Sequence, residues 1–128
     1  MSCILRVIVP SAKLSSVMAI IDLNTDRVWH KGETDAIRRE PNLNSGFTVM
    51  ISEAENFRSQ IEEALSFVRV NGTKLSALNT DVDSVVLDFG ISVVGDKAGE
   101  YYSFPCELVQ EVAAINGSIE LSRYVIDG

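Results

Sequence analysis

The sequence predicts an α+β fold, with about three helices packed on a mostly antiparallel sheet. Two hydrophobic periods occur along the chain: apolar residues alternate with other residues in several short runs, and recur at helical spacing in three longer ones. The strand-like runs outnumber the helical ones and often follow each other directly, which favours antiparallel pairing over a doubly wound parallel sheet. With 128 residues, of which 46% are hydrophobic, the chain forms one globular domain over residues 1–128.

The first predicted strand and helix are short. Leu5, Val7 and Val9 alternate with the residues between them, which is the period of a strand with one buried face, and a proline then ends the run. The helix after it begins with a serine, a common N-cap residue, and its apolar side chains share one face.

Residues 27–32 form a short extended piece. Residues 33–46 form a polar loop of about 14 residues, a length typical of functional or mobile segments.

The most clearly patterned helix follows a strand over residues 47–51. Ser52 and Glu55 have the spacing of a capping box, in which each side chain bonds a free amide at the helix start. Apolar side chains then recur at every third or fourth position. Asn71-Gly72 supplies a stop signal, so we expect the helix to end there.

The second half of the chain predicts a long strand, a hairpin and a final helix and strand. Large apolar residues occupy alternate positions over residues 85–93, so one side of this strand packs and the other is wet or thinly covered. Residues 95–99 have the composition of a hairpin loop, and residues 100–103 would be its returning strand. A proline and a glycine bracket the third helix, and residues 119–126 form the closing strand. The predicted order is β-α-β-β-α-β-β-α-β.

The charge of the chain is acidic and unevenly distributed. The 18 acidic and 11 basic side chains give a net charge of −7. Residues 1–75 hold nine acids and nine bases, whereas residues 76–128 hold nine acids and two bases. This balance argues against nucleic-acid binding, which needs a surplus of Lys and Arg on one face. No stretch approaches the roughly 20 apolar residues of a membrane span, and the N-terminus has no basic leader, so we expect a soluble, cytoplasmic protein.

The sequence contains no recognisable catalytic constellation, metal site or cofactor motif. His30 is the only histidine, and no serine or cysteine lies in an activating local context. Neither Cys3 nor Cys106 has a Cys or His neighbour at metal-ligand spacing. The glycine motifs that bind nucleotide phosphates are also missing. We therefore expect no catalysis, metal or cofactor, and an enzyme with His30 as general base is the least favoured interpretation.

One dense group of chemically useful side chains lies within residues 27–39. Four Lys or Arg cations and the only imidazole fall within these 13 residues of an otherwise acidic chain. Guanidinium groups bind carboxylates and phosphates through paired hydrogen bonds, and a tryptophan offers a stacking surface. A structural alternative is that the tryptophan only seals the edge of the core beneath two long cationic stems. The candidate ligand-binding residues are Arg27, Trp29, His30, Lys31, Glu33 and Arg38.

Two short motifs and the order of the elements point to a family. The motifs are Trp29-x-Lys31-Gly32-Glu33 and Ser103-Phe104-Pro105. With the pattern of strands and helices over residues 4–126, the chain resembles the uncharacterised bacterial family catalogued as domain of unknown function 4279. The resemblance implies a small α+β domain associated with bacterial contact-dependent toxin neighbourhoods, and it assigns no catalytic residue.

Two binding functions follow as expectations. The first is a non-catalytic protein-interaction module, such as an immunity-type protein that binds a basic toxin or another basic partner, because complementary charge speeds encounter and selects partners. The second is a small-anion-binding sensor or carrier that uses residues 27–39. The acidic surface for a protein partner would comprise Asp81, Asp83, Asp88, Asp96, Glu100, Glu107 and Glu111, together with Glu120.

Overall fold

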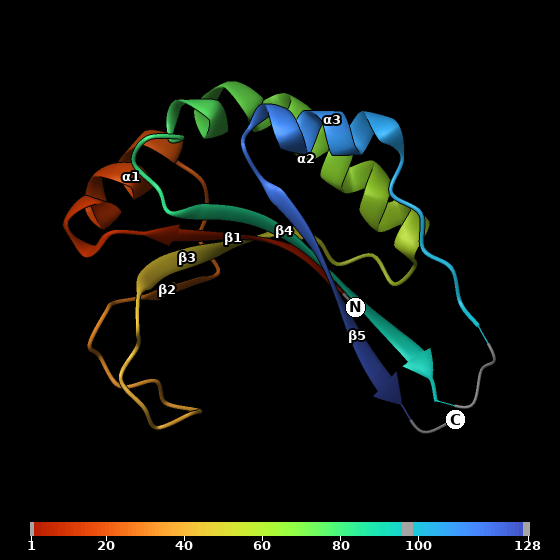
Figure 1. Ribbon diagram of the computed structural model, residues 1–128, viewed down its shortest axis with the longest axis horizontal. Coiled ribbons are helices and arrows are strands. Elements are labelled where there is room, and N and C mark those ends of the chain that lie inside the picture. Colours follow the sequence, from red (N-terminus) through yellow and green to blue (C-terminus); the bar gives the residue numbers. More distant parts are fainter. Residues whose placement is uncertain (1, 96–98, 127–128) are drawn as a thin grey trace.

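Five strands form one sheet, and three helices lie on a single face of it (Figure 1). The structure, a computed structural model, describes residues 2–95 and 99–126, and the elements below are those of this part of the chain. In chain order they are β1 (Ser2–Val9), a 3-10 turn (Ser11–Lys13), α1 (Leu14–Ile21), β2 (Arg27–Trp29), β3 (Ser45–Ser52), α2 (Phe57–Ala77), β4 (Ser84–Val94), α3 (Cys106–Ala114) and β5 (Ser118–Ile126).

The strands lie in the order β2-β3-β1-β4-β5. Neighbouring strands are antiparallel except β4 and β5, which run parallel and are connected through α3. The elements from β1 to β4 therefore form a split βαβ arrangement, and α3 and β5 add a fifth strand beside β4. The predicted α+β class, with helices packed on a mostly antiparallel sheet, is confirmed.

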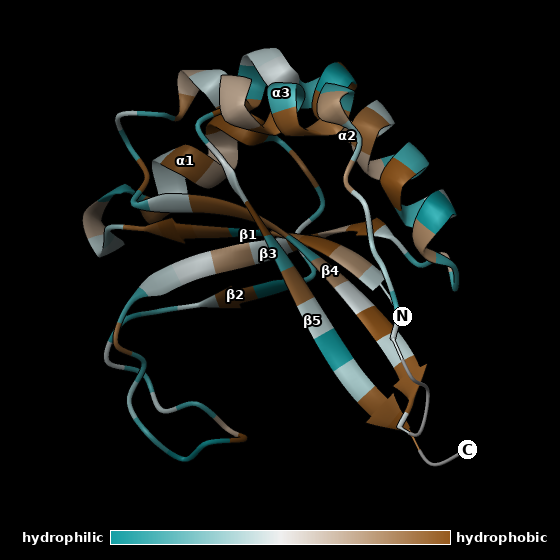
Figure 2. Cartoon of the chain, turned by 45° about the vertical axis from the view of Figure 1, so that its right-hand side comes forward, coloured by the Kyte–Doolittle hydropathy of each residue, from teal (hydrophilic) through white to brown (hydrophobic). Residues whose placement is uncertain are grey.

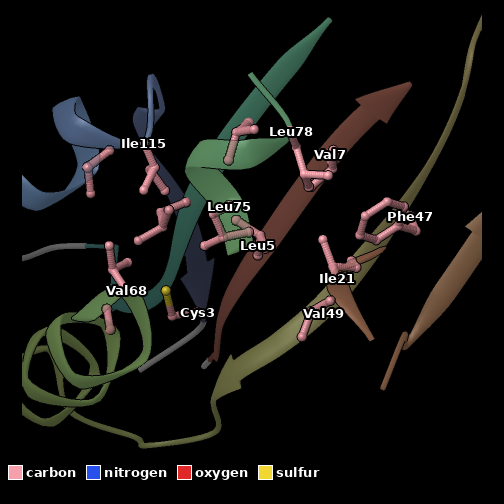
Figure 3. Close-up of a cluster of buried hydrophobic side chains, with 14 of the residues drawn as sticks. Cys3, Leu5, Val7, Ile21, Phe47, Val49, Val68, Leu75, Leu78 and Ile115 are labelled. Carbon is pink, nitrogen blue, oxygen red and sulfur yellow. The ribbon is translucent and has the colours of Figure 1, made fainter. Parts of the chain in front are cut away.

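The hydrophobic core lies between the sheet and the helices (Figure 3). Alternate side chains of β1 and β4 point into it and are almost completely buried, as their period of two predicts. Leu5 and Val7 of β1 and Phe47 and Val49 of β3 gather there with apolar side chains of α1 and α2. Each large side chain buried in this way stabilises the fold by about 1.5–3 kcal/mol.

Helix α2 differs from its prediction at both ends. Asn56, and not Ser52, is its N-cap, because the Asn56 side chain accepts a hydrogen bond from the Ser59 amide at 2.8 Å. The helix also continues past Asn71-Gly72 to Ala77. Leu75, in the added turn, is completely buried, so tertiary packing outweighs the local stop signal. Within the described ranges, no helix is long and apolar enough to cross a membrane.

The predicted returning strand over residues 100–103 is wrong. Residues 99–105 contain no helix or strand, and the strand that pairs with the C-terminal half of β4 is β5. The predicted hairpin loop, residues 95–99, lies partly outside the described residues. The segment instead brings Tyr102 and Phe104 against Phe57, with ring centroids 5.2 Å and 5.3 Å away in edge-to-face contacts.

Candidate functional site

The face of the sheet opposite the helices, called here the open face, is hollowed. Residues 30–44 project from β2 and β3 on this side, and the far ends of β4 and β5 also bend away from the helices (Figure 1). The projecting segment is largely hydrophilic, whereas those far ends of β4 and β5 are hydrophobic (Figure 2). The open face therefore lies between two flanks of different chemistry.

A concave site of about 510 Å³, called here the trough, occupies the open face. Its volume lies within the range of roughly 300–1,000 Å³ that is usual for small-molecule sites. The strands supply its floor, and residues 30–44 supply one wall. The trough is lined by Ile4, Arg6, Ile8, Arg27, Trp29, Asp35, Arg38, Asn42, Leu43, Asn44, Thr48, Asp88 and Tyr124.

Arg6 lies at the centre of the floor and is held by two carboxylates. Its guanidinium lies 2.5 Å from Asp88 and 3.0 Å from Glu120, and the Ser122 hydroxyl donates to Asp88 at 2.7 Å. Partial burial lowers the pKa of Arg6, but the hydrogen bonds to Glu120 and Asp88 outweigh this effect and raise the pKa above its ordinary value. Arg6 is therefore a fixed cation whose charge is already balanced.

Arg27 and Trp29 form the wall of the trough at β2. The guanidinium of Arg27 lies 5.9 Å from the centre of the Trp29 ring, a cation–π distance. The Trp29 indole N–H donates to the Asn44 side chain at 2.9 Å, which fixes the ring plane. The ring also lies against the bare backbone of Gly46, where a Cβ atom would come within 2.7 Å of it. Arg27 forms no ion pair with any residue that the structure describes.

The Trp29 ring lies on the open face, because its neighbours across the sheet, Gly46 and Ile8, belong to that face. The buried core lies on the other face of the same strands. Trp29 therefore lies on the opposite side of the sheet from the core, and its role in ligand binding stays a prediction. The half-buried ring, fixed by Asn44, lines the trough, and the Arg27 guanidinium lies over it.

Arg38 reaches the trough from the projecting segment, whose fold depends on Asp35 and Asn42. One Asp35 carboxylate oxygen accepts from the amides of Ile37 and Arg38, both at 2.8 Å, and the other lies 3.5 Å from the Arg38 guanidinium. The two amide hydrogen bonds lower the pKa of Asp35, with a smaller contribution from the Arg38 charge. The buried Asn42 side chain donates to the His30 carbonyl at 3.0 Å and so ties the base of the segment.

The other predicted ligand-binding residues lie outside the trough. His30 and Glu33 line a neighbouring hollow of about 400 Å³, which shares Arg27, Trp29, Asp35 and Asn42 with the trough. There the imidazole Nδ1 lies 4.0 Å from the Glu33 carboxylate. The chain turns at Lys31 and Gly32, so Lys31 lines neither hollow. Of the six predicted residues, Arg27, Trp29 and Arg38 thus line the trough, and Arg27, Trp29, His30 and Glu33 line the neighbouring hollow.

Sequence reasoning missed several residues of the trough. Arg6 was visible only as a charged residue within an apolar strand, and its carboxylate partners lie 82 and 114 positions away in the sequence. Asp35 and Asn42 could have been noticed, because such side chains often bond the backbone of their own loop. No group of three or more His, Cys, Asp or Glu side chains in the described ranges is arranged to hold a metal ion.

The predicted acidic surface is divided among several places. Asp88 and Glu120 lie on the open face beside Arg6. Glu107 and Glu111 belong to α3 in the helix layer, and Asp81 precedes β4. Lys13 lies 3.3 Å from Asp81 and Arg69 lies 3.8 Å from Glu111, so two of these carboxylates also have cationic partners. The remaining predicted residues are Asp83, which is exposed, Glu100, which accepts a hydrogen bond from Tyr102, and Asp96, which lies outside the described residues.

Comparisons with known proteins identify no relative of the chain. No family model matches it, and neither a curated protein nor a solved structure matches it. The resemblance to domain of unknown function 4279 therefore stays a prediction.

Proposed function

We propose that the protein is a non-catalytic module that binds a small anionic molecule in the trough. The observation that supports this most directly is the position of Arg27. Its guanidinium lies in a concave site beside a fixed Trp29 ring and has no carboxylate partner among the described residues. A cation of this kind can accept an anion without first losing an ion pair.

A ligand in the trough also meets side chains that are already ordered. Asn44 fixes Trp29, Asp35 fixes Arg38, and the two carboxylates on the floor fix Arg6. Ordering these long side chains before binding reduces the entropy lost on association. The site is therefore suited to a sensor or carrier, in which the bound molecule is recognised and not converted. We place this activity in the cytoplasm, where the two free cysteines stay reduced.

Trp29 provides the test, since it is the only tryptophan in the chain and lies in the trough wall. We expect an anionic ligand from a panel of carboxylates, phosphates and sulfonates to change Trp29 fluorescence and to raise the melting temperature. At about a hundred times its Kd, such a ligand stabilises the fold by about 2.7 kcal/mol. Arg27→Ala should weaken binding about ten- to a hundredfold, which is the effect of losing a charged hydrogen bond.

Lys74→Ala is the matched control, because it removes one positive charge from the last turn of α2, in the helix layer. It should leave the affinity unchanged. If no anion of the panel changes either signal, or if both variants weaken binding equally, the trough is not the binding site.

A basic protein partner is the second candidate, and one observation favours it. A groove of about 380 Å³ in the helix layer, between α2 and the start of α3, has apolar walls that include Ile61 and Leu65. Glu107 and the Arg58–Glu62 ion pair lie beside these walls. Such a groove suits an apolar segment with flanking cations. Glu107→Lys should then reduce capture of a basic partner at low salt, and unchanged capture would remove this candidate.

A further inference from the structure

We infer that the ligand of the trough is a singly charged carboxylic acid with a flat, apolar body. This inference rests on the proposed anion-binding function and narrows it to one chemical class. It follows from the balance of charge along the trough and from the apolar surface next to Arg27.

The charges that line the trough leave room for one negative charge. Three arginines and two carboxylates line it, which is a surplus of one positive charge: Arg6 is paired with Asp88, and Arg38 with Asp35. Glu120, the second partner of Arg6, is half-exposed and lies outside the lining. Arg27 is the lining cation without an ion pair among the described residues. A monoanion satisfies Arg27, whereas a phosphate with two negative charges, or a longer polyanion, brings its extra charge towards Asp35 and Asp88. Like charges in a partly desolvated site repel each other strongly, so the lining disfavours such ligands.

The geometry of Arg27 suits a carboxylate. A guanidinium presents two parallel N–H groups that match the two oxygens of a carboxylate, and a neutral amide of the same shape offers one acceptor and no charge. The acid should therefore bind far better than its amide. The difference between the two compounds measures what the charge on Arg27 contributes.

One surface next to Arg27 is apolar, and Trp29 and Ile8 form it. The Trp29 ring is held in one plane by Asn44 and by its contact with Gly46. On the floor, half-buried Ile8 of β1 lies beside Trp29, across Gly46, whereas Ile4 lies on the far side of Arg6. An aromatic ring can lie against Trp29 in an offset or edge-to-face contact and cover this floor while its carboxylate meets Arg27.

Three probes with the same phenyl ring test the inference: 3-phenylpropionate, its amide and phenyl phosphate. We expect 3-phenylpropionate to change Trp29 fluorescence with an affinity at least about tenfold higher than that of either other probe. Arg27→Ala should remove the preference for the acid over the amide. Arg27→Lys should restore it only in part, because the charge returns without the paired donors. Lys74→Ala should bind all three probes as the unchanged protein does.

The failure of this inference differs from the failure of the proposed function. If phenyl phosphate or other multiply charged anions bind more tightly than 3-phenylpropionate, and Arg27→Ala weakens them, the trough binds anions but the ligand class is wrong. If the amide binds as well as the acid, the charge on Arg27 does not select the ligand, and the inference is again overturned. If no anion binds in a manner that depends on Arg27, both the inference and the proposed function fail.

Discussion

The two faces of the sheet have different chemistry, although alternate residues of the same strands form both. In β1, Leu5 and Val7 on the helix-covered face are completely buried. Arg6 between them lies on the open face, with 29% of its side chain exposed and two carboxylates as partners. In β4, Leu87 and Phe89 are likewise buried in the core on either side of Asp88. Neighbouring residues of one strand thus serve packing on one face and polar contacts on the other.

This arrangement separates stability from binding along the sequence. A substitution on the covered face removes apolar contacts and acts on the free energy of unfolding. A substitution in the wall of the trough removes a contact that the proposed ligand would make, and should leave the fold almost unchanged. A variant that changes the free energy of unfolding and the ligand affinity equally would contradict this separation. The predictions below test it, beginning with the largest effect.

The largest effect is expected for Leu5→Ala on the covered face. Leu5 is completely buried in the centre of β1, and its truncation leaves a cavity between the sheet and α2. We expect the free energy of unfolding in urea to fall by about 2–5 kcal/mol. Arg27→Ala, on the open face, should change it by less than about 0.5 kcal/mol. A similar loss in both variants would show that the two faces do not divide these roles.

A smaller effect is expected for Arg6→Met, which leaves Asp88 without its cation. The Asp88 side chain is only 12% exposed, and the lost hydrogen bonds involve charged groups. Because Arg6 and Glu120 are partly exposed to water, we expect a loss of about 1–2 kcal/mol and not the larger cost of a fully buried pair. Adding Asp88→Asn to this variant should recover part of the loss. A double-mutant cycle with no coupling would mean that the pair contributes nothing to stability.

Local periodicity was enough to predict the covered face, because each strand and helix that forms it has a strong apolar period of its own. The alternation in β4 correctly identified Leu87 and Phe89 as core residues, but on the opposite side, expected to be thinly covered, Asp88 and Gly90 are also buried. The prediction failed where a distant contact outweighed a local signal. Asn71-Gly72 is a common helix end, but the buried Leu75 beyond it keeps α2 helical.

The trough was only partly predictable, because it depends on strand order. The cluster of cations identified Arg27 and Arg38, and the chain topology then decided which neighbours joined them. Arg6 comes from β1, which lies beyond β3 as seen from β2. The acidic residues illustrate the same limit. Their closeness in sequence suggested one surface, but the sheet lies between Glu107 in the helix layer and Glu120 on the open face.

A third prediction concerns the wall of the trough and its response to acid. Hydrogen bonds from the amides of Arg38 and Ile37 lower the pKa of Asp35 below its usual 3.8. The stabilisation that its carboxylate gives to the segment is therefore complete above the unfolded pKa, and is lost as the pH falls through the lowered one. We expect the amide NMR signals of these two residues to titrate with a midpoint below pH 3.8. In Asp35→Asn they should not titrate there.

The outcome of this titration also tests how the wall is built. A midpoint at or above pH 3.8 would mean that the two amides do not bond the carboxylate in solution. Asp35→Asn should also loosen Arg38 and speed tryptic cleavage after it, since trypsin needs an extended, mobile segment. Unchanged cleavage would show that Asp35 does not hold the projecting segment in place.

The two thiols are expected to have the smallest effect on the free energy of unfolding at neutral pH. They lie in different environments, one in the core and one on the surface. Cys3 lies in the core, where burial, with smaller contributions from Asp88 and Glu63, raises the pKa of its thiol to about 12. Cys106 is exposed at the start of α3. We expect a maleimide to label one thiol rapidly in the native protein at neutral pH, and Cys106→Ser to abolish this rapid reaction. Rapid labelling that persists in Cys106→Ser would show that the covered face opens readily at the start of β1.

The raised pKa of Cys3 also gives its contribution to stability a definite direction with pH. The protonated thiol suits the core, so this contribution is complete below the unfolded pKa of about 9 and is lost as the pH rises towards 12. The loss approaches about 1.4 kcal/mol per pH unit only where the thiol is ionised in the unfolded chain and protonated in the folded one. Cys3→Ala should flatten this alkaline decline in the free energy of unfolding. If the decline stays equally steep without the thiol, other groups cause it, because an alanine at this position has no proton to lose.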